Sequence, residues 1–233
     1  MAVDETRLGR GIYSVPEASR LVRVSAQRIK RWLRGYEYQV RRERRTSQPV
    51  IAADYPSESG SLTLSFLDLI EVRFINEFRS AGVSWGAIRI ASNRAQQILN
   101  EDHPFSTKRF RTDGKTILVE IARESGEKEL LDLVRDQFAF RKIVWPYLYK
   151  GVDFGPEDVA SRWWPMDRRR QVVLDPARAF GQPIVDREGV PTATLAESYE
   201  AEGSIERVAG WFEISVASVR DAVEFEQQLS AAA

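Results

Sequence analysis

The sequence contains no cysteine and a single histidine in its 233 residues. The absence of cysteine excludes disulfide bonds, thiolate zinc sites, iron–sulfur clusters and cysteine nucleophiles. With His103 as the only imidazole, a metal site built on two histidines is excluded, and a Ser-His-Asp triad would have to use that one residue. Most hydrolase and metalloenzyme functions are therefore excluded, and a protein that is not an enzyme is the better prediction.

Long apolar runs are also missing, since no stretch approaches the roughly 20 residues that a membrane-spanning helix needs. The first residues show neither a charged segment followed by an apolar one nor a small-residue cleavage site, so nothing marks the chain for secretion. Hydrophobic residues at 43% and charged residues at 29% are ordinary for a globular protein. We therefore expect a folded cytoplasmic protein with no membrane partner, and no motif predicts a cofactor or a metal.

The formal net charge is zero, but the charge is distributed unevenly along the chain. Residues 1–50 hold twelve Lys and Arg against five Asp and Glu, whereas residues 171–233 hold four against eleven. A basic end suits a polyanion such as nucleic acid, because neutralised phosphates release their condensed counterions. The acidic end cannot do this, and we expect it to serve folding, self-association or a basic partner.

Residues 12–35 predict two short helices joined by a tight turn. Ser14 and Glu17 form a capping-box pattern, and Ser25 is placed to cap the second helix. On that helix Ile29, Trp32 and Leu33 share one apolar face. This is the helix-turn-helix layout, in which the second helix enters the major groove. The predicted DNA-binding residues of this helix are Ser25, Gln27, Arg28, Lys30, Arg31 and Arg34.

The turn between these helices departs from the usual pattern, because Arg23 stands where many such motifs have glycine. The following residues, 36–50, alternate weakly between apolar and polar. They predict either a two-stranded wing against the DNA backbone or a basic linker without fixed structure. The wing would add four predicted DNA contacts, Arg41, Arg42, Arg44 and Arg45.

Two further helices are predicted between Leu62 and Leu99. Ser65 and Ser84 are placed to cap them, and apolar residues recur at helical spacing in both. With the turn RSAGVS and the opening WGAIR, the whole segment resembles the MerR-like winged helix-turn-helix family. The resemblance implies that residues 1–100 form a DNA-binding domain that acts as a dimer on paired half-sites roughly 34 Å apart.

The middle of the chain, residues 101–167, predicts a hairpin, a helix and a connector. Residues 103–121 contain Asp113-Gly114, a strong hairpin-turn signal, and His103 is expected at the surface or in packing. Residues 127–149 predict one aromatic-rich helix, which Pro146 ends or kinks. The glycines, prolines and balanced charge of residues 151–170 indicate a connector.

The last third, residues 168–233, predicts a small β structure followed by three helices. A short strand stops at Asp175-Pro176, and a helix capped by Thr192 or Thr194 follows. Ser204 and Ser215 are placed to cap the two remaining helices, a second helix-turn-helix pattern. Its expected exposed residues are acidic, so we expect it to pair chains rather than to read DNA. These residues are Glu206, Glu213, Asp221, Glu224 and Glu226.

The same region resembles an antitoxin-associated domain of unknown function, number four-three-three. The match covers the VxDP start, the GxPxI segment, the V-P-T step into the first helix and the helical pattern at the end. One departure is the turn between Asp186 and Gly189, which carries acidic residues where the family favours a glycine and a basic residue. The matching residues are Val173, Asp175, Pro176, Gly181, Pro183, Ile184, Val190, Pro191, Thr192, Ile205, Val208, Val219 and Ala222.

A MerR-like domain followed by this domain resembles the larger VapB-type antitoxins. The resemblance implies an α+β fold, mainly helical with small β-hairpins, and a chain that represses its own operon and neutralises a PIN-domain ribonuclease toxin. An arginine could enter the acidic metal pocket of such a nuclease by pairing with its carboxylates. The candidate toxin-binding residues, chosen by charge and aromatic character, are Arg162, Trp163, Trp164, Arg168, Arg169 and Arg170.

Two other functions stay open at this point. The chain could be a stand-alone MerR-like regulator whose effector binds among the aromatic residues of 138–149. It could also be an enzyme that uses the carboxylates Asp153, Glu157 and Asp158, although such a trio is more often a solvated loop.

Overall fold

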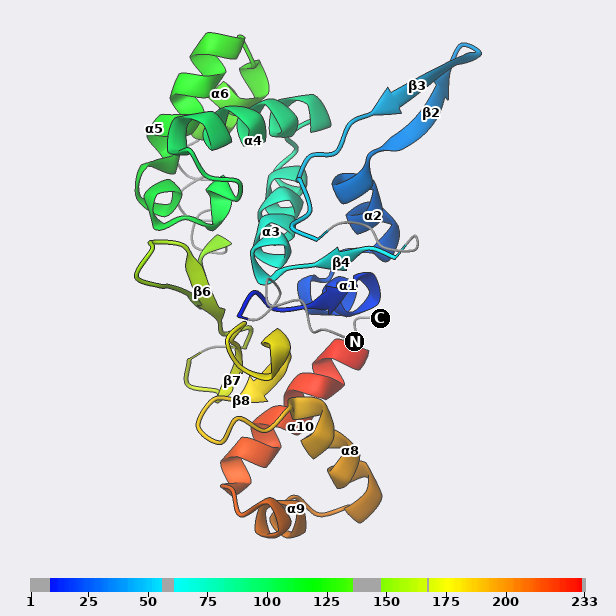
Figure 1. Ribbon diagram of the computed structural model, residues 1–233, viewed down its shortest axis with the longest axis vertical. Helices are drawn as coiled ribbons and strands as arrows, with labels where there is room; N and C mark the ends of the chain where they lie inside the picture. The colour runs from blue at the N-terminus through cyan, green and yellow to red at the C-terminus, as the bar shows by residue number, and fades with distance from the viewer. Residues whose placement is uncertain (1–8, 56–60, 136–147, 167, 232–233) are drawn as a thin grey trace. The chain divides into compact units, whose positions relative to one another are not determined.

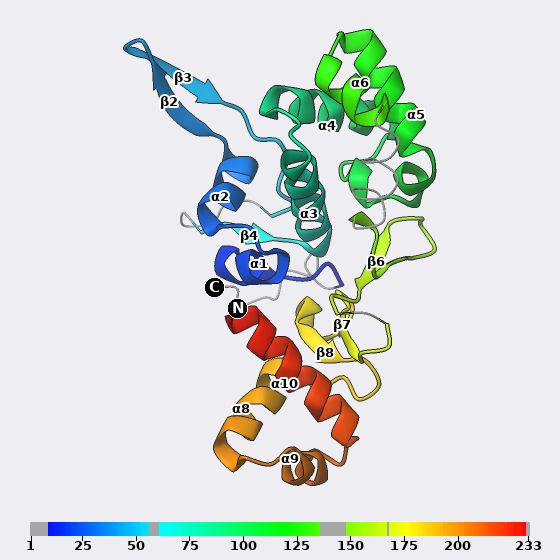
Figure 2. The same cartoon turned by 180° about the vertical axis from the view of Figure 1, so that it is seen from behind.

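The computed structural model describes the chain except for residues 1–8, 56–60, 136–147, 167 and 232–233 (Figures 1 and 2). The chain divides into two compact units. The N-terminal unit comprises Ser14–Tyr149 and Phe154–Ala160, and the C-terminal unit comprises Met1–Tyr13, Lys150–Asp153 and Ser161–Ala233. The fold is mixed α+β, as the sequence predicts. Within the described residues, every helix is too short or too polar to cross a membrane.

The N-terminal unit is a winged helix-turn-helix extended by further helices. A two-stranded antiparallel sheet, β2–β3, follows the first helix pair. The short strand β1 (Tyr13–Ser14) precedes them. The elements are α1 (Val15–Val22), α2 (Ala26–Arg34), β2 (Tyr36–Val40), β3 (Glu43–Ser47), β4 (Thr63–Leu64), α3 (Phe66–Ser80), α4 (Trp85–Leu99), the 3-10 turn η2 (Pro104–Ser106), α5 (Lys108–Ser125) and α6 (Lys128–Arg135).

Predicted caps start the helices of this unit. Ser14 accepts a hydrogen bond from the amide of Glu17, whose carboxylate accepts one in return, and Ser65 and Asp68 make the same box on α3. Ser84 accepts from the α4 backbone as predicted. Ser25 occupies the N-cap position of α2, but its side chain makes no capping hydrogen bond.

An aromatic cluster forms the core where α3 meets η2 and α5. Phe74 and Phe105 stack with ring centroids 5.5 Å apart, and Phe110 and Tyr149 meet Phe74 edge to face. Each such pair contributes about 0.5–1.5 kcal/mol beyond the burial of its area. The core therefore fixes α3, the helix whose far end faces α2.

The predicted hairpin at residues 103–121 is wrong, because this stretch forms η2 and the long helix α5. Thr107 caps α5, and residues Phe110, Gly114, Ile117 and Ile121 are buried at helical spacing. Gly114 costs the helix about 1 kcal/mol relative to alanine, and it lies on the buried face. The Asp113-Gly114 turn signal is local, and burial along the helix outweighs it.

The predicted helix 127–149 is described only in part. Residues 128–135 form α6, while residues 136–147, with most of the aromatic residues expected to line an effector pocket, lie outside the described part of the chain.

The C-terminal unit pairs a small sheet with three helices. The sheet has the strand order β5-β6-β7-β8, with β7 antiparallel to both β6 and β8. The elements are β5 (Val152–Phe154), β6 (Ala160–Trp163), β7 (Val172–Leu174), the 3-10 turn η4 (Ala179–Gly181), β8 (Pro183–Val185), α8 (Thr192–Glu202), α9 (Ile205–Phe212) and α10 (Val216–Ser230).

The connector predicted at 151–170 is therefore wrong for residues 152–163, which form two strands of this sheet. The amide of Trp164 donates to the carbonyl of Gly151 at 2.8 Å, and Trp163 pairs with Leu174 on β7. Glycine and proline in this segment mark the turns between short strands. Composition alone does not distinguish such turns from a linker.

The three C-terminal helices pack around a small apolar core. Ser204 and Ser215 cap α9 and α10 as predicted. The predicted cap of α8 is wrong, because Pro191 holds the N-cap position. The hydroxyl of Thr192 instead contacts Glu226 and the carbonyl of Pro183. The core consists of Val185, Leu195, Val208, Ala209, Val219, Ala222 and Val223.

Candidate nucleic-acid interface

The turn between α1 and α2 keeps helix-turn-helix geometry without glycine. Arg23 adopts a left-handed conformation with φ 55° and ψ 41°, and the amide of Val24 returns to the carbonyl of Ser19. Left-handed backbone is costly for a side chain with a Cβ atom. Arginine in place of the usual glycine therefore raises the conformational free energy of the turn but does not change its backbone conformation.

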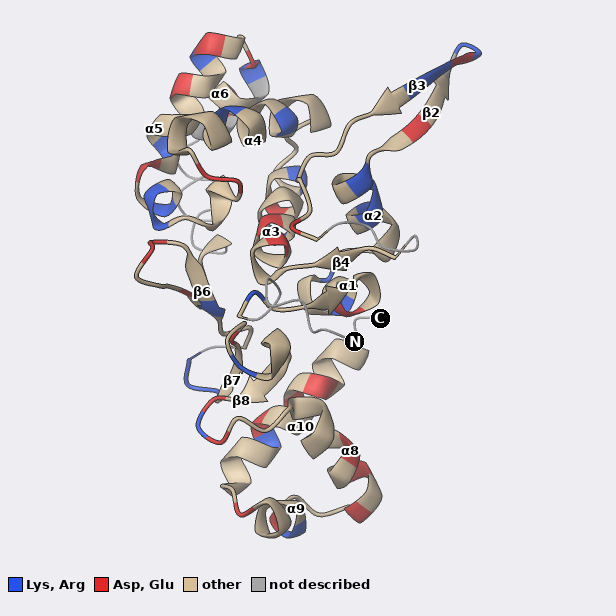
Figure 3. Ribbon diagram, viewed as in Figure 1, with Lys and Arg blue, Asp and Glu red and all other residues tan. Residues whose placement is uncertain are grey.

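Helix α2 buries one face and exposes the other. Ile29, Trp32 and Leu33 are buried as predicted. The opposite face carries the helix's four basic side chains, and in Figure 3 basic residues mark both α2 and the tip of the hairpin. All six residues predicted to contact DNA from this helix and its cap are exposed, namely Ser25, Gln27, Arg28, Lys30, Arg31 and Arg34.

The wing predicted after α2 is present. Strands β2 and β3 pair from Tyr36↔Ser47 to Val40↔Glu43, which leaves the two-residue turn Arg41-Arg42 at the tip. Both turn residues have positive φ, at 49° and 71°, as a turn that follows strand twist requires. The tip therefore presents arginine side chains to solvent.

The other two predicted wing cations lie beside carboxylates of the same hairpin. Arg44 is 3.6 Å from Glu37, and Arg45 is 3.2 Å from Glu43. These pairs are exposed and are worth little in water, so a phosphate can replace the carboxylate at small cost.

Gly35 joins α2 to the wing. Its φ is +73°, and a Cβ atom there would lie 2.2 Å from the carbonyl oxygen of Ser47. The amide of Val50 donates to the carbonyl of Trp32 at 2.8 Å. These close backbone contacts hold the base of the wing against the end of α2, so the two predicted DNA-binding elements are positioned together.

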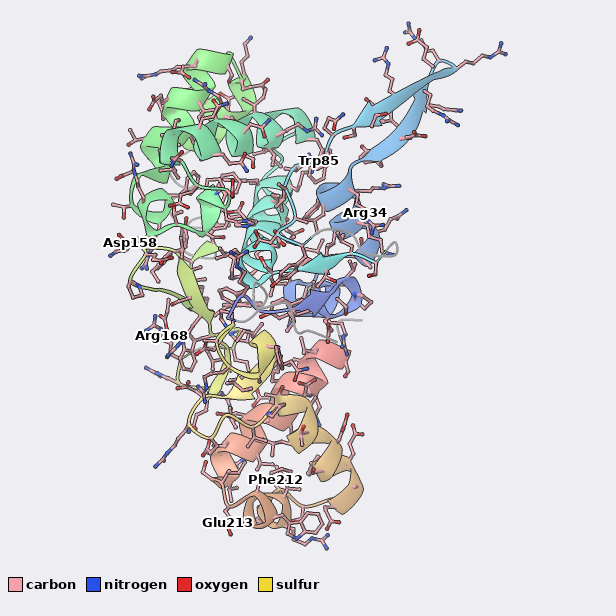
Figure 4. All side chains as sticks on the ribbon, in the orientation of Figure 1. Arg34, Trp85, Asp158, Arg168, Phe212 and Glu213 are labelled. Carbon is pink, nitrogen blue, oxygen red and sulfur yellow. The ribbon has the colours of Figure 1, made fainter. Side chains whose placement is uncertain are left out.

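Three residues beside this surface were not predicted. Trp85 at the start of α4, labelled in Figure 4, contacts Trp32 with ring centroids 5.2 Å apart, and Arg79 lies over Trp85 at 4.8 Å. Arg89 donates to the hydroxyl of Ser47 at 2.9 Å. They reach α2 and the wing only because α3 and α4 pack against them, and no local sequence signal gives that packing.

The residues predicted to bind a toxin lie on or beside β6, mostly with partners inside the C-terminal unit. Arg162 pairs with Asp175 at 3.2 Å, and Arg170 pairs with Asp221 at 2.9 Å and with Glu224 at 3.0 Å. The indole of Trp164 and the guanidinium of Arg168 both donate to Asp153. The set is completed by Trp163, which is buried, and Arg169, which is exposed.

The acidic surface of the C-terminal helices differs at three residues from the prediction, because Asp221 is buried and Glu224 and Glu226 are only partly exposed. Asp221 is buried rather than exposed, because it accepts hydrogen bonds from Arg170 and from the amide of Gln171. Conversely Trp211 on α9 is 63% exposed, an aromatic of the kind that anchors protein interfaces.

A buried charged cluster lies at the start of α3. The Nε2 atom of His103 is 2.9 Å from an oxygen of Asp54, and its Nδ1 atom is 3.9 Å from Oδ1 of Asp68. Both Nδ1 of His103 and Oδ1 of Asp68 are buried without a hydrogen-bond partner. Nearby, Glu71 accepts from the amide of Ser106 at 3.0 Å.

The protonation of this cluster follows from its burial and its charges. Burial alone lowers the pKa of His103, but the hydrogen bond to Asp54 and the charges of Glu71, Asp54 and Asp68 outweigh it and raise the pKa to about 9. Burial raises the pKa of Glu71 to about 7 and that of Asp68 to about 6.

Donor atoms of Asp54, Asp68 and His103 lie within 4.8 Å of one another, a spacing that could hold a metal ion. The pair of His103 and Asp54 already engages one atom of each residue, however. The geometry fits an imidazolium between carboxylates better than a metal centre.

The carboxylates considered for an enzyme have structural partners of their own. Asp153 accepts from Trp164 and Arg168, and Asp158 pairs with Lys108 at 3.0 Å. Glu157 is exposed in the loop before β6. Ion pairing and exposure account for these residues without a catalytic role.

Comparison with known proteins gives two family matches along the chain. Residues 11–92 match a family described as "Putative DNA-binding HTH domain", and residues 172–225 match one described as "Protein of unknown function (DUF433)". The first match spans the helix-turn-helix, the wing and most of α3–α4. The second spans β7 to most of α10.

A curated relative and a solved structure match nearly the whole chain, both from Mycobacterium tuberculosis. The chain is 31% identical over 231 residues to "Putative antitoxin VapB45" of strain ATCC 25618 / H37Rv, covering 94% of this chain and 95% of the relative. It is 27% identical to the protein of the X-ray crystal structure of Rv2018, with a TM-score of 0.71 over 91% of this chain and 96% of that one. These likenesses point to a DNA-binding antitoxin rather than an enzyme.

Proposed function

Because the chain belongs to the VapB-type antitoxin family, we propose that it represses its own operon and neutralises a PIN-domain ribonuclease by direct contact. Both activities would reside in one cytoplasmic homodimer, whose two α2 helices meet half-sites one helical turn apart. The N-terminal domain, residues 1–100, would read the operator. The C-terminal domain, residues 168–233, would serve chain pairing and, together with the end of the connector before it, the toxin.

The exposed face of α2 supports the DNA-binding part of the proposal most strongly. Gln27, Arg28 and Arg31 project from the same helix whose other face is buried. Glutamine can pair with adenine and arginine with guanine in the major groove, while neighbouring cations hold phosphates. The arginines at the tip of the wing add further exposed cations (Figure 3).

Operator binding is tested with Arg28→Ala and Arg31→Ala. Each change should weaken binding to a duplex from the chain's upstream region, by about 1–3 kcal/mol for a base contact, or by a salt slope about one unit smaller for a phosphate contact. Arg123→Ala removes the same charge from an exposed position on α5 and is the matched control. Variants of Arg28 and Arg31 that bind like the control would refute the assignment of α2.

The toxin-binding part rests on the cations around β6. PIN-type nucleases hold metal ions with carboxylates, which an arginine can engage through two parallel hydrogen bonds. Arg168 and Arg169 are exposed, and the exposed pair of Arg168 with Asp153 can exchange its carboxylate for one of the toxin. We therefore place the contact with the toxin on residues 162–170.

Recovery of the partner tests this directly. The tagged full chain, purified from its host through a high-salt wash, should retain a stoichiometric small protein with acidic metal-binding motifs, identified by intact mass spectrometry. Arg168→Ala with Arg169→Ala should weaken its retention and its inhibition, whereas Arg187→Ala, exposed in the loop after β8, should not. If both variants inhibit the toxin equally, the toxin-binding surface lies elsewhere on the chain. If the chain is recovered alone, the toxin-binding part of the proposal is refuted.

A further inference from the structure

A cavity of about 370 Å³ lies beside the exposed face of α2. It is bounded by α2, the base of the wing, the end of α3 and the start of α4, all within the N-terminal unit. Figure 4 labels Trp85 at this position, between α4 and the wing. The side chains that define its chemistry are Arg28, Arg31, Arg79, Arg89, Trp32 and Trp85.

The charge of this cavity is uncompensated. Four of its lining residues are arginines, and none of the lining residues is Asp or Glu. Among the described residues, none of the four arginines is within ion-pair distance of a carboxylate. Guanidinium groups gathered in a concave surface without counter-charges create a strong positive potential that draws an anion.

Two of the arginines are held in place by the fold. Arg89 donates through Nη2 to the hydroxyl of Ser47 and the carbonyl of Gln48, at 2.9 and 3.0 Å, while its buried Nε has no hydrogen-bond partner. Arg79 donates to the carbonyl of Val83 and lies over the ring of Trp85. A buried donor without a partner is uncommon in folded proteins, and Arg89 is one of the residues that line this cavity.

The aromatic residues serve as walls rather than as stacking platforms. Trp32 is buried, and the guanidinium groups of Arg79 and Arg31 already lie over the rings of Trp85 and Tyr36. What the cavity offers a ligand is therefore a set of forked hydrogen-bond donors. A tetrahedral phosphate matches this geometry, because each guanidinium can present two N–H groups to two of its oxygens.

We propose that this cavity binds a phosphate ester, with Arg79 and Arg89 as its anchoring residues and Arg28 and Arg31 at its edge. The ester is either a backbone phosphate of operator DNA, a source that rests on the proposed function, or the phosphate of a free nucleotide. A free nucleotide would compete with DNA, because Arg28 and Arg31 belong both to the cavity and to the predicted DNA-binding face.

The test uses the full chain, its Arg79→Gln and Arg89→Gln variants, and Arg123→Gln as a charge-matched control outside the cavity. Adenosine monophosphate is titrated into each protein by calorimetry, and binding to the upstream duplex is measured over a series of salt concentrations. Arg79→Lys keeps the charge but loses the fork. This variant distinguishes the loss of a phosphate contact from a disturbance of the turn before α4. Thermal unfolding is recorded for all the proteins.

A DNA source predicts that each glutamine variant lowers duplex affinity several-fold and reduces the salt slope by about one unit relative to Arg123→Gln. Arg79→Lys should keep the slope, and adenosine monophosphate should not bind saturably. A free-nucleotide source predicts saturable binding of adenosine monophosphate by the wild type. That binding would weaken at least ten-fold in both glutamine variants and would be displaced by the duplex.

The proposal is overturned if both glutamine variants behave like Arg123→Gln toward the duplex and toward the nucleotide. This outcome leaves the proposed function intact when the wild type still binds its operator through Arg28 and Arg31. A wild type that fails to bind the duplex defeats the operator proposal instead, and the nucleotide titration then decides the cavity by itself.

Discussion

Replacing His103 should remove a pH-dependent contribution to the stability of the N-terminal unit. The imidazole is buried against Asp54, Asp68 and Glu71, and its pKa is raised from 6.5 to about 9. Since the folded state holds the proton more tightly than the unfolded state, this stabilisation is full below pH 6.5 and is lost as pH rises through 9.

The size of the effect follows from the shift. Each pKa unit corresponds to about 1.4 kcal/mol, so the full contribution is about 3 kcal/mol. Between pH 7 and 9.5, where Asp68 with a pKa of about 6 is largely ionised and Glu71 completes the second half of its titration at about 7, the contribution of His103 to the free energy of unfolding should fall by about 2 kcal/mol. His103→Gln keeps a donor for Asp54 but not the charge, and its unfolding free energy should lack this component.

Urea unfolding followed by far-UV circular dichroism at pH 7, 8, 9 and 9.5 measures the difference. The variant should be less stable than the wild type at pH 7, and the gap should narrow by about 2 kcal/mol toward pH 9.5. Lys108→Gln, which breaks the exposed pair with Asp158, should cost less than about 1 kcal/mol and keep the slope of the wild type. A constant gap between His103→Gln and wild type across this range would refute the assignment of a buried imidazolium.

Three further changes test the backbone and the core. Arg23→Gly relieves a left-handed residue and should stabilise the N-terminal unit by about 0.5–1 kcal/mol, seen as a higher thermal midpoint. Gly35→Ala drives a Cβ atom against Ser47; it should cost about 1–3 kcal/mol and weaken duplex binding by displacing the wing, and unchanged binding would contradict a fixed wing base. Leu195→Ala opens the fully buried core of the C-terminal unit; it should cost about 2–5 kcal/mol in urea, and a loss below 1 kcal/mol would contradict that packing.

The parts of the fold that local chemistry controls could be predicted from the sequence. Ser14 with Glu17 and Ser65 with Asp68 start helices because each pair satisfies backbone donors within four residues. The exposed cations of α2 followed from the same helical periodicity that places Trp32 inside. The α2 face could therefore be identified as a candidate site without tertiary information.

Features that depend on distant partners could not be predicted. A turn-forming pair at Asp113-Gly114 becomes helix because the apolar stripe beginning at Phe110 finds α3 and α4 to pack against. Trp163 becomes a strand residue because Leu174 pairs with it. Arg79 and Arg89 join the basic surface only through the packing that brings α3 and α4 beside α2, so the cavity appears only in three dimensions.

The two helix-turn-helix patterns show what their shared local chemistry does and does not determine. The α1–α2 turn has Arg23 at φ 55° and ψ 41°, and the α9–α10 turn has Glu213 at φ 55° and ψ 38°. In each, a serine cap follows two residues later, and the intervening amide returns to a carbonyl five residues back, Val24 to Ser19 and Ile214 to Ala209.

The two turns thus share one backbone conformation although the helices beside them expose opposite charges. Backbone conformation and buried apolar residues determine the turn, and they place no constraint on the charge of the exposed positions. Helix α2 exposes arginine and lysine, whereas the exposed side of the α8–α10 bundle is mainly acidic (Figure 3). A carboxylate facing phosphate is repelled, so the acidic copy of the motif is unsuited to DNA. The feature of that copy that is typical of a protein interface is the exposed Trp211 on α9, not the helix-turn-helix pattern.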